Sequence, residues 1–546
     1  MKQSMTEPSI CCILSDVAQL DEQAYNVRLR VMVDSKSNKV LYVEAGKDFV
    51  DALFSFLTMP LGTIARLVAK DSNIEAVPFG SLSSLYQSIA DLDENYICKE
   101  MLLNPRNSME AYCKKLKLNI DDTEPIQYFL CENSDCNRNQ FSLFKNQKCS
   151  CGKVMNRELH LSPQPECLRL GNGFATENAT FIISDGLYVM PNVFGSVVHL
   201  HHKHKITNFE AIVEQNVQIT KKEVVDILKL SLSSKTPLTD FIFKKQHFPA
   251  KLRNRNQTEF KIGEVTHDKG RQMSVKVVRQ KSTGKILFAE AGADFIDFVC
   301  SFQTFPLGGV LHMLQGVSSL ECIDNLYKSV AKLSPDMYLV SQDVKEKLRK
   351  PLVAAQFELG NQILPISAAS LPVHYYHSYF VKSCLFGSVT TSRKHGGYSR
   401  ESFVPLKLVE PKFSAWGKFA KGPSMFMVTD DLVVTPISSF NAVSYLNSLN
   451  VPLLDVEERV VKIGLKEGLS VLKASLTSTS ALTNGLSNVF KSRWWWRSLR
   501  LRSVVMIVLV SFAVVGHNAA VVEGKSFKLP QAIKLGSPFR YNTNSS

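Results

Sequence analysis

The sequence VLYVEAGKDFVDALFSFLTMPLG at residues 40–62 returns as ILFAEAGADFIDFVCSFQTFPLG at residues 286–308. Thirteen of these 23 positions are identical, and each lies 246 residues from its counterpart. A period of this length is far longer than a solenoid repeat, so it indicates a duplicated folding unit. Within the stretch, Phe49, Leu53 and Phe56 recur at the spacing of one helix face, which predicts that they belong to a core.

Three more segment pairs extend the duplication along the chain. They occur in the same order in both copies, at offsets between 241 and 246 residues: SLYQSIA (84–90) with NLYKSVA (325–331), TFIISDGLYVMP (180–191) with MFMVTDDLVVTP (425–436), and LKLSLSSKTPLTD (228–240) with LKASLTSTSALTN (472–484). We therefore predict two homologous tandem halves, at residues 20–243 and 272–490. A polar, basic linker at residues 244–271 is expected to join them.

Turn signals and periodicity predict an α+β fold for each half. The β-rich runs around residues 35–38 and 281–284 indicate hairpins, and Asp185 with Gly186 marks another tight turn. Apolar periodicity predicts a helix over residues 460–476. We expect β-hairpins and small antiparallel sheets packed on helices in both halves.

Aspartates stand where the helix of the repeated stretch should begin. Asp48 and Asp294 occupy the expected N-cap positions. Asp51 and Asp297 follow three residues later, near the positive end of the helix dipole. The proline of each PLG motif is expected to end the helix. Capping therefore explains these aspartates without a catalytic role.

The glutamates of the repeated stretch are the candidate functional carboxylates. Glu44 and Glu290 lie at a strand end just before a glycine, and catalytic groups often gather at such places. Glu44 with Asp48 could form an acid–base couple, which leaves an enzyme of unknown reaction as an alternative. No histidine, nucleophile or glycine-rich phosphate loop stands near them in the sequence. We therefore assign no catalytic residue and favour a protein without enzymatic activity.

The segment CENSDCNRNQFSLFKNQKCSCG carries the clearest chemical motif of the chain. It holds two close cysteine pairs separated by 12 residues: Cys131, Cys136, Cys149 and Cys151. Two thiolate pairs on short turns suit a tetrahedral zinc ion in a ribbon-like knuckle at about residues 128–155. Because four thiolates fill the coordination sphere, the pattern predicts a structural zinc. The alternative is four unlinked thiols in a loop. The second half has only Cys384 in the corresponding region, so zinc cannot be essential to the shared fold.

A second metal-like motif, HLHHKH, contains four histidines: His199, His201, His202 and His204. Imidazoles this close can bind a soft or borderline metal ion. However, the matching residues 444–449 of the second half contain no histidine. We favour a solvated loop.

The formal net charge of +14 raises the question of nucleic-acid binding. Nine lysines or arginines and one acidic residue lie at residues 491–546, so +8 of this charge belongs to the tail. Nucleic-acid binding requires clustered cations that release counterions, and the body has one modest basic cluster, at residues 244–255. We expect no specific nucleic-acid binding and keep a zinc-assisted form of it as an alternative.

Both ends of the chain bear on its location in the cell. The first residues lack the apolar core of a secretory signal, so we expect a cytoplasmic body with reduced cysteines. Near the other end, three tryptophans and several cations precede an apolar segment at residues 504–522. A transmembrane helix needs about 20 mostly apolar residues, so this segment is a candidate membrane anchor. An interfacial helix and an error in the gene model are the alternatives.

The repeated motifs resemble those of a known family. The EAGxDF(I/V)D…PLG block, the (S/T)D(D/G)L…P hairpin and the closing LK-SL-S-T-LT helix resemble a plant family, domain of unknown function 674. The resemblance covers roughly residues 20–491 and excludes the tail. It implies a duplicated architecture and a plant origin, and it implies no activity, substrate or catalytic residue. We therefore favour a binding or scaffold protein with structural zinc and an unidentified protein partner.

Overall fold

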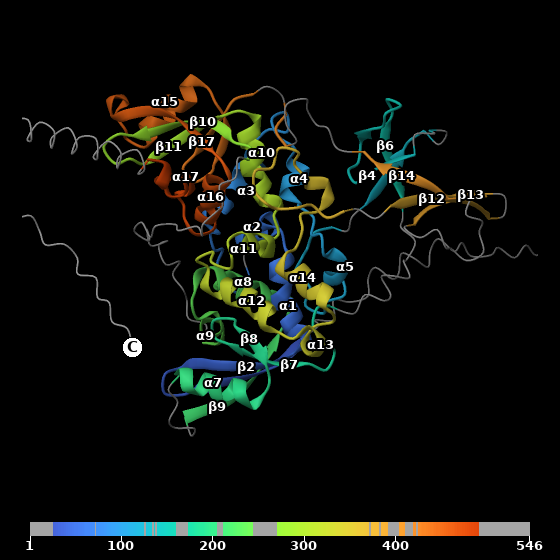
Figure 1. The fold of residues 1–546 in the computed structure, drawn as a ribbon, viewed down its shortest axis with the longest axis vertical. Helices are drawn as coiled ribbons and strands as arrows, with labels where there is room; N and C mark the ends of the chain where they lie inside the picture. The colour runs from blue at the N-terminus through green and yellow to red at the C-terminus, as the bar shows by residue number, and fades with distance from the viewer. Residues whose placement is uncertain are drawn as a thin grey trace, which may run out of the picture. The chain divides into compact units, whose positions relative to one another are not determined.

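The computed structural model describes residues 26–70, 72–124, 127–133, 136, 139–159, 173–204, 211–243, 270–370, 373–381, 384–390, 403–409, 419–421 and 424–490 (Figure 1). Those up to Leu486 belong to one compact unit, and the second unit is described only at residues 487–490. Residues 244–269 of the predicted linker and the apolar segment 504–522 lie outside the described residues. Among the helices that are described, none combines the length and apolarity needed to cross a membrane.

Two five-stranded antiparallel sheets share one strand order. The first has the order β8-β7-β2-β1-β9, formed by β1 (Val27–Asp34), β2 (Lys39–Gly46), β7 (Thr180–Ser184), β8 (Val189–Pro191) and β9 (Ile212–Ile219). The second has the order β16-β15-β11-β10-β17, formed by β10 (Met273–Gln280), β11 (Ile286–Ala291), β15 (Phe426–Thr429), β16 (Val434–Pro436) and β17 (Val456–Ile463). All three predicted hairpin turns are confirmed, because each joins a pair of antiparallel strands.

Helices surround both sheets, which confirms the α+β prediction. Those before the second sheet are α1 (Lys47–Thr58), α2 (Leu61–Ala69), α3 (Gly80–Asp91), α4 (Lys99–Leu103), α5 (Glu110–Cys113), α7 (Phe194–His204), α8 (Lys221–Ser233) and α9 (Pro237–Ile242). The second half contains α10 (Ala293–Ser301), α11 (Leu307–Met313), α12 (Glu321–Lys332), α13 (Pro335–Tyr338), α14 (Gln342–Arg349), α15 (Ser439–Ser448), α16 (Leu465–Thr477) and α17 (Ala481–Gly485). Short 3-10 turns lie at Phe302–Thr304, Ala355–Phe357 and Leu453–Asp455.

The helix α1 begins two residues earlier than its aspartate predicts. Gly46 and Gly292 are the N-cap residues of α1 and α10, so the prediction that Asp48 and Asp294 cap these helices is wrong. Both glycines keep the extended backbone of the preceding strand, because the strand runs directly into the helix. Asp48 therefore lies in the first turn, where its carboxylate accepts a hydrogen bond from Lys117 at 2.7 Å.

The helix predicted over residues 460–476 begins only at Leu465. Residues Val456–Ile463 form β17 and pair with β10 along the whole strand. This backbone ladder outweighs the helical spacing of the apolar residues, since strand formation depends on the tertiary context of a segment.

The helix α1 lies in a core to which both halves contribute. Every residue of α1 except Asp48 is buried, including positions outside the predicted apolar face. The helix contacts β2, β7 and α8 of its own half, and it also contacts α11, α12 and α14 of the second half. A helix enclosed in this way needs apolar side chains on every face, which Ala52, Phe54 and Leu57 supply.

The PLG motifs of the two halves contact each other directly. Their prolines form an antiparallel bridge, in which the Leu61 amide donates to the Phe305 carbonyl at 2.9 Å. The reciprocal hydrogen bond runs from the Leu307 amide to the Met59 carbonyl at 3.0 Å. The prediction that the proline ends the helix fits α1, which ends two residues before Pro60, whereas α10 ends at Ser301 and a 3-10 turn separates it from Pro306. Both prolines are N-cap residues of the next helix, so each motif begins a helix and also joins the opposite half.

A buried aspartate of the first half holds a second contact between the halves. One carboxylate oxygen of Asp51 accepts the amides of Phe174 and Ala175 at 2.9 and 2.7 Å. The Phe174 carbonyl in turn accepts the Val340 amide of the second half at 2.9 Å. Asp51 thus positions a loop whose other edge pairs with the opposite half.

The second half repeats this arrangement with Asp297. Its carboxylate accepts the amides of Phe419 and Ala420, both at 2.9 Å. The Phe419 carbonyl accepts the Cys98 amide of the first half, also at 2.9 Å. The two halves therefore interlock through equivalent contacts.

A third sheet of seven strands contains segments from both halves. Its order is β13-β12-β14-β4-β3-β6-β5. It is formed by β3 (Tyr128–Cys131), β4 (Gln140–Ser142), β5 (Gln147–Lys148), β6 (Val154–Leu159), β12 (His374–Val381), β13 (Cys384–Thr390) and β14 (Phe403–Leu408). Figure 1 shows the teal strands of the first half beside the orange strands of the second. The two sets meet where β14 pairs in parallel with β4.

Candidate metal centre

Four cysteine side chains of the third sheet converge on one point. Their sulfur atoms all lie within 4.8 Å of one another: Cys131, Cys136, Cys149 and Cys151. The Sγ atoms of Cys131 and Cys151 are 3.5 Å apart, and those of Cys136 and Cys149 are 3.6 Å apart. A tetrahedral zinc ion bound to sulfur at about 2.3 Å requires sulfur separations of roughly 3.8 Å. The four predicted ligands therefore lie together, in an arrangement that fits one metal ion.

The strands β3 to β6 form a small ribbon within the third sheet, and short turns of this ribbon hold the four cysteines in place. Cys131 ends β3, and the amide of Cys136 closes a turn shortly after it. The second pair follows β5, where the amide of Cys149 donates to the Lys153 carbonyl at 2.8 Å. Gly152 has a φ of +90°, a conformation that favours glycine, and it returns the chain to β6 directly after the second pair.

Neighbouring side chains support the cysteine cluster. The side-chain oxygen of Gln140, at the start of β4, accepts hydrogen bonds from the amide and hydroxyl of Ser150 at 3.2 and 2.6 Å. Phe129, Met155 and the partly buried Val409 pack with the cysteines. An apolar shell around a hydrogen-bonded ligand turn fixes the ligand geometry and restricts the access of water.

The thiols of the cluster differ in acidity. Burial raises the pKa of Cys149 to about 12, and it also raises the pKa of Cys131. The backbone amide of Lys153 lowers the pKa of the exposed Cys151 to about 7. Metals bind the thiolate form, so metal binding must displace protons from this cluster and is favoured as the pH rises.

The histidine motif forms no comparable cluster. It lies on the helix α7, so the expectation of a loop at this position is wrong. Within the described ranges, the four cysteines are the only group of three or more potential ligands close enough to hold a metal ion. His201 lies against Tyr42, with ring centroids 6.1 Å apart, and burial lowers its pKa. Leu200 and His201 therefore pack against the sheet, whereas His199 and His202 are exposed.

Glu44 and Glu290 occupy corresponding places in the two five-stranded sheets. The Arg30 guanidinium lies 2.8 Å from Glu44 and 2.9 Å from Glu214, which links three neighbouring strands. In the second sheet, Lys276 lies 2.5 Å from Glu290. Ion pairs between strands account for both carboxylates, and the two residues lie in different sheets. Their acid–base role stays a prediction.

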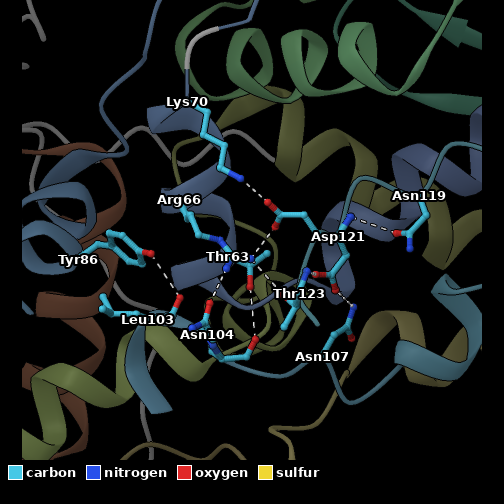
Figure 2. Close-up of polar contacts among 12 residues, drawn as sticks. Thr63, Arg66, Lys70, Tyr86, Leu103, Asn104, Asn107, Asn119, Asp121 and Thr123 are labelled. Carbon is cyan, nitrogen blue, oxygen red and sulfur yellow. Dashed lines mark hydrogen bonds and ion pairs between the residues drawn. The ribbon is translucent and has the colours of Figure 1, made fainter. Parts of the chain in front are cut away.

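A polar network that sequence reasoning missed joins α2 to residues 104–123 (Figure 2). Arg66 pairs with Asp122 at 2.6 Å, and Asn107 donates to Asp121 at 3.4 Å. The available signal was the density of asparagine and aspartate in this loop, since both residues are typical of turns.

A small cavity of about 30 Å³ lies beside this network. Its lining includes Arg106, Glu110, Lys114 and Asp121. Glu110 is paired with Lys114 at 2.6 Å, and Asp121 accepts the amide of Thr123 at 3.1 Å. The first pair lies along α5 and the second contact lies within the turn at residues 121–123, and we assign no ligand to the cavity.

Of the comparisons with known proteins, the one with protein families found a match. No curated protein and no solved structure matches the chain. The model of a family described as protein of unknown function matches residues 23–466, which include both five-stranded sheets and the cysteine cluster. The chain therefore belongs to this family, DUF674, as its repeated motifs predicted.

Proposed function

We propose that this protein is a non-enzymatic scaffold or binding protein in which four cysteines hold a structural zinc ion. The convergence of four sulfur atoms within 4.8 Å carries this proposal. Four thiolates complete a tetrahedral shell and leave no position open for water or substrate. Such a site stabilises a fold and does not activate a reactant.

The proposal also holds that the two halves arose by duplication. The equal strand order of the two five-stranded sheets supports this origin. The repeated residues with a clear role are structural: the PLG motifs join the halves, and Asp51 and Asp297 hold the loops that pair across them. These structural roles explain why the PLG motifs and the two aspartates occur in both halves, and they require no repeated reaction centre.

Metal analysis of the purified, reduced full-length chain tests the zinc site. We expect about one zinc per chain, because four-thiolate sites bind zinc tightly at neutral pH. The variants Cys131→Ser and Cys149→Ser should lose the metal. Cys98→Ser is the matched control, since Cys98 is a buried cysteine outside the cluster. A folded, reduced wild-type chain with less than about half an equivalent of zinc would refute the site.

Absence of enzymatic activity is tested with Glu44→Gln. Turnover of a metabolite by the wild-type chain that is lost in Glu44→Gln would contradict the scaffold proposal. The control is Glu214→Gln, which removes the other carboxylate paired with Arg30. If Glu214→Gln loses turnover to the same extent as Glu44→Gln, the loss comes from breaking the ion pairs of Arg30 and not from a catalytic role of Glu44.

We propose that the binding partner of this chain is another protein, which is not yet identified. Phe194 is the first residue of α7 and Phe440 the second residue of α15, and the two residues are 84% and 80% exposed. Large exposed aromatic residues often mark interaction surfaces. We expect a co-purifying protein that is lost in the double variant Phe194→Ser/Phe440→Ser and kept in Val317→Ser, another exposed apolar position.

Truncation after residue 490 separates the body from the tail in this experiment. A partner of the body should remain bound to the truncated chain. We propose that residues 504–522 can attach the full-length protein to membranes, which predicts membrane-bound protein that is released by the truncation. Salt-sensitive nucleic acid that co-purifies with the truncated chain would contradict the assignment of a protein partner.

A further inference from the structure

We propose that the cysteine-bound metal acts as a clasp between the two halves: its binding in the first half controls the docking of residues 407–409 of the second half. This inference rests on the proposed metal site. It adds a conformational consequence, because the affected strand belongs to the opposite half of the chain.

Backbone hydrogen bonds join the metal ribbon to the second half. The Lys407 amide donates to the Asn139 carbonyl at 2.7 Å, and the Val409 amide donates to the Phe141 carbonyl at 2.8 Å. These bonds form the parallel joint between β14 and β4. The other neighbour of β14 is β12, which pairs with an earlier part of the strand. The end of β14 is therefore held by the ribbon.

Side chains connect the same joint to the metal ligands. Val409 packs on the buried group that contains Cys131 and Cys149. Gln140 belongs to β4 and fixes the turn between the second pair of cysteines through Ser150. A change in the turns that carry the cysteines therefore affects β4, which is hydrogen-bonded to β14, and the buried group on which Val409 packs.

The ribbon is built from short strands, of which β6 is the longest with six residues. Its strands β3, β4 and β5 contain four, three and two residues. Strands this short are marginal without a larger core, and metal binding in small ribbons supplies much of the folding free energy. Removal of the metal should therefore loosen β4, whose Gln140 holds the ligand turn, and β14 loses its docking partner as a result.

Hydrogen exchange of the full-length protein, with zinc and with a chelator, tests the clasp. We expect the amides of Lys407 and Val409 to lose protection by on the order of tenfold or more when zinc is removed. The amides of Leu61 and Leu307 serve as internal controls, because they join the halves far from the ribbon in sequence. Their protection should not change.

Thermodynamic linkage provides a second measurement. If zinc favours docking, weaker docking must lower the zinc affinity by the same factor. Val409→Ser should therefore weaken zinc binding on the order of fivefold in competition with a chromogenic chelator. Val373→Ser is the matched control, since Val373 is 56% exposed, and its zinc affinity should equal that of the wild type.

The outcomes separate the two proposals. A reduced, folded chain that binds no zinc overturns the metal site itself. A chain that binds zinc through the four cysteines, with unchanged protection at residues 407–409 and unchanged affinity in Val409→Ser, overturns the clasp and leaves the metal site intact.

Discussion

Buried carboxylates recur at equivalent places in the two halves and serve as anchors for the backbone. Asp51 and Asp297 are each 1% exposed, and each accepts two backbone amides. Asp51 also has the Lys47 ammonium at 2.5 Å, whereas Ala293 stands at the position of Lys47 in the second half. Burial raises the pKa of Asp51 to about 6, despite these favourable contacts.

Replacing the anchors tests this role. We expect Asp51→Ala and Asp297→Ala each to lower the free energy of unfolding by about 2 to 5 kcal/mol, because two buried amides lose their acceptor. Asp48→Ala is the control, since its ion pair with Lys117 is largely exposed and should contribute about 1 kcal/mol or less. Urea denaturation measures all three. If Asp48→Ala lowers the free energy of unfolding as much as Asp51→Ala and Asp297→Ala do, the hydrogen bonds to the buried amides are not the main source of stability at these positions.

A second pair of aspartates ties the late hairpin of each half to a helix. Asp185 accepts both the amide and the hydroxyl of Thr239, at 2.9 and 2.7 Å. Asp430 accepts the amide of Thr483 at 2.8 Å with one oxygen. Within the described part of the chain, its other oxygen is buried without a hydrogen-bond partner. Burial raises the pKa of Asp430 to about 6.

The raised pKa predicts a pH dependence of stability. Between about pH 4 and pH 6 the folded chain holds the Asp430 proton more tightly than the unfolded chain. The free energy of unfolding contributed by this group is therefore present at low pH and falls as the pH rises through 6. The shift corresponds to about 1 to 3 kcal/mol.

Asparagine variants test this dependence. Asp430→Asn should make the decrease between pH 4 and 6 smaller, while Asp51, whose pKa is also raised to about 6, keeps its own contribution. At pH 7 this variant should be neutral or stabilising, because no buried charge remains at residue 430. Asp185→Asn should be destabilising at pH 7, because its amide group cannot replace both acceptor oxygens for Thr239. Thermal melts of the wild type and both variants across this pH range measure how their stability depends on pH. The same slope in Asp430→Asn and wild type would assign the pH dependence to other groups.

At the scale of elements, close approach of backbones explains the glycine of each PLG motif. A Cβ atom on Gly62 would lie 3.0 Å from the Gln303 carbonyl oxygen, and one on Gly308 would lie 2.9 Å from the Leu57 carbonyl oxygen. These contacts join opposite halves and are equivalent in the two motifs. Gly46, by contrast, has no atom within 4 Å of the same position.

Alanine substitutions distinguish the two kinds of glycine. Gly62→Ala and Gly308→Ala should each lower the free energy of unfolding by about 2 kcal/mol or more, because the backbones must separate. Gly46→Ala should cost about 1 kcal/mol or less, as expected for an N-cap glycine without a steric constraint. Chemical denaturation compares them, and a larger loss in Gly46→Ala would contradict the close contact between halves.

At the scale of the whole molecule, the two halves pack against each other through several helices. The buried helix α1 packs on helices of the second half, while α3 contacts α16 and α12 contacts α8 across the same boundary. Every such contact joins segments that are distant in sequence. Neither half therefore encloses a complete core by itself.

Calorimetry of the full-length protein tests whether the two halves unfold cooperatively. We expect one unfolding transition that includes both halves, with equal calorimetric and van't Hoff enthalpies for the described body. Asp297→Ala should move the whole transition to lower temperature. Two separable transitions, only one of them shifted by Asp297→Ala, would show that the halves unfold independently.

Local pattern was sufficient for a large part of the fold. Hairpins at residues 35–38 and 281–284 were predictable because turn residues separate β-rich runs within a short window. The cysteine cluster was predictable for the same reason, since all four cysteines lie within 21 consecutive residues, 131–151. The N-cap of α1 was not predictable in this way, because the strand runs directly into the helix and Gly46 takes the cap position expected for Asp48.

The sequence alone determined the family, the α+β class and the residues of the cysteine cluster, because these depend on repeated motifs and on neighbours along the chain. Only the tertiary structure decided what the repeated carboxylates do. Glu44 meets its partners on adjacent strands, and Asp51 meets amides more than 120 residues away. It also decided that the halves interlock, since a contact such as Leu61 with Phe305 joins segments whose separation in sequence leaves no local pattern.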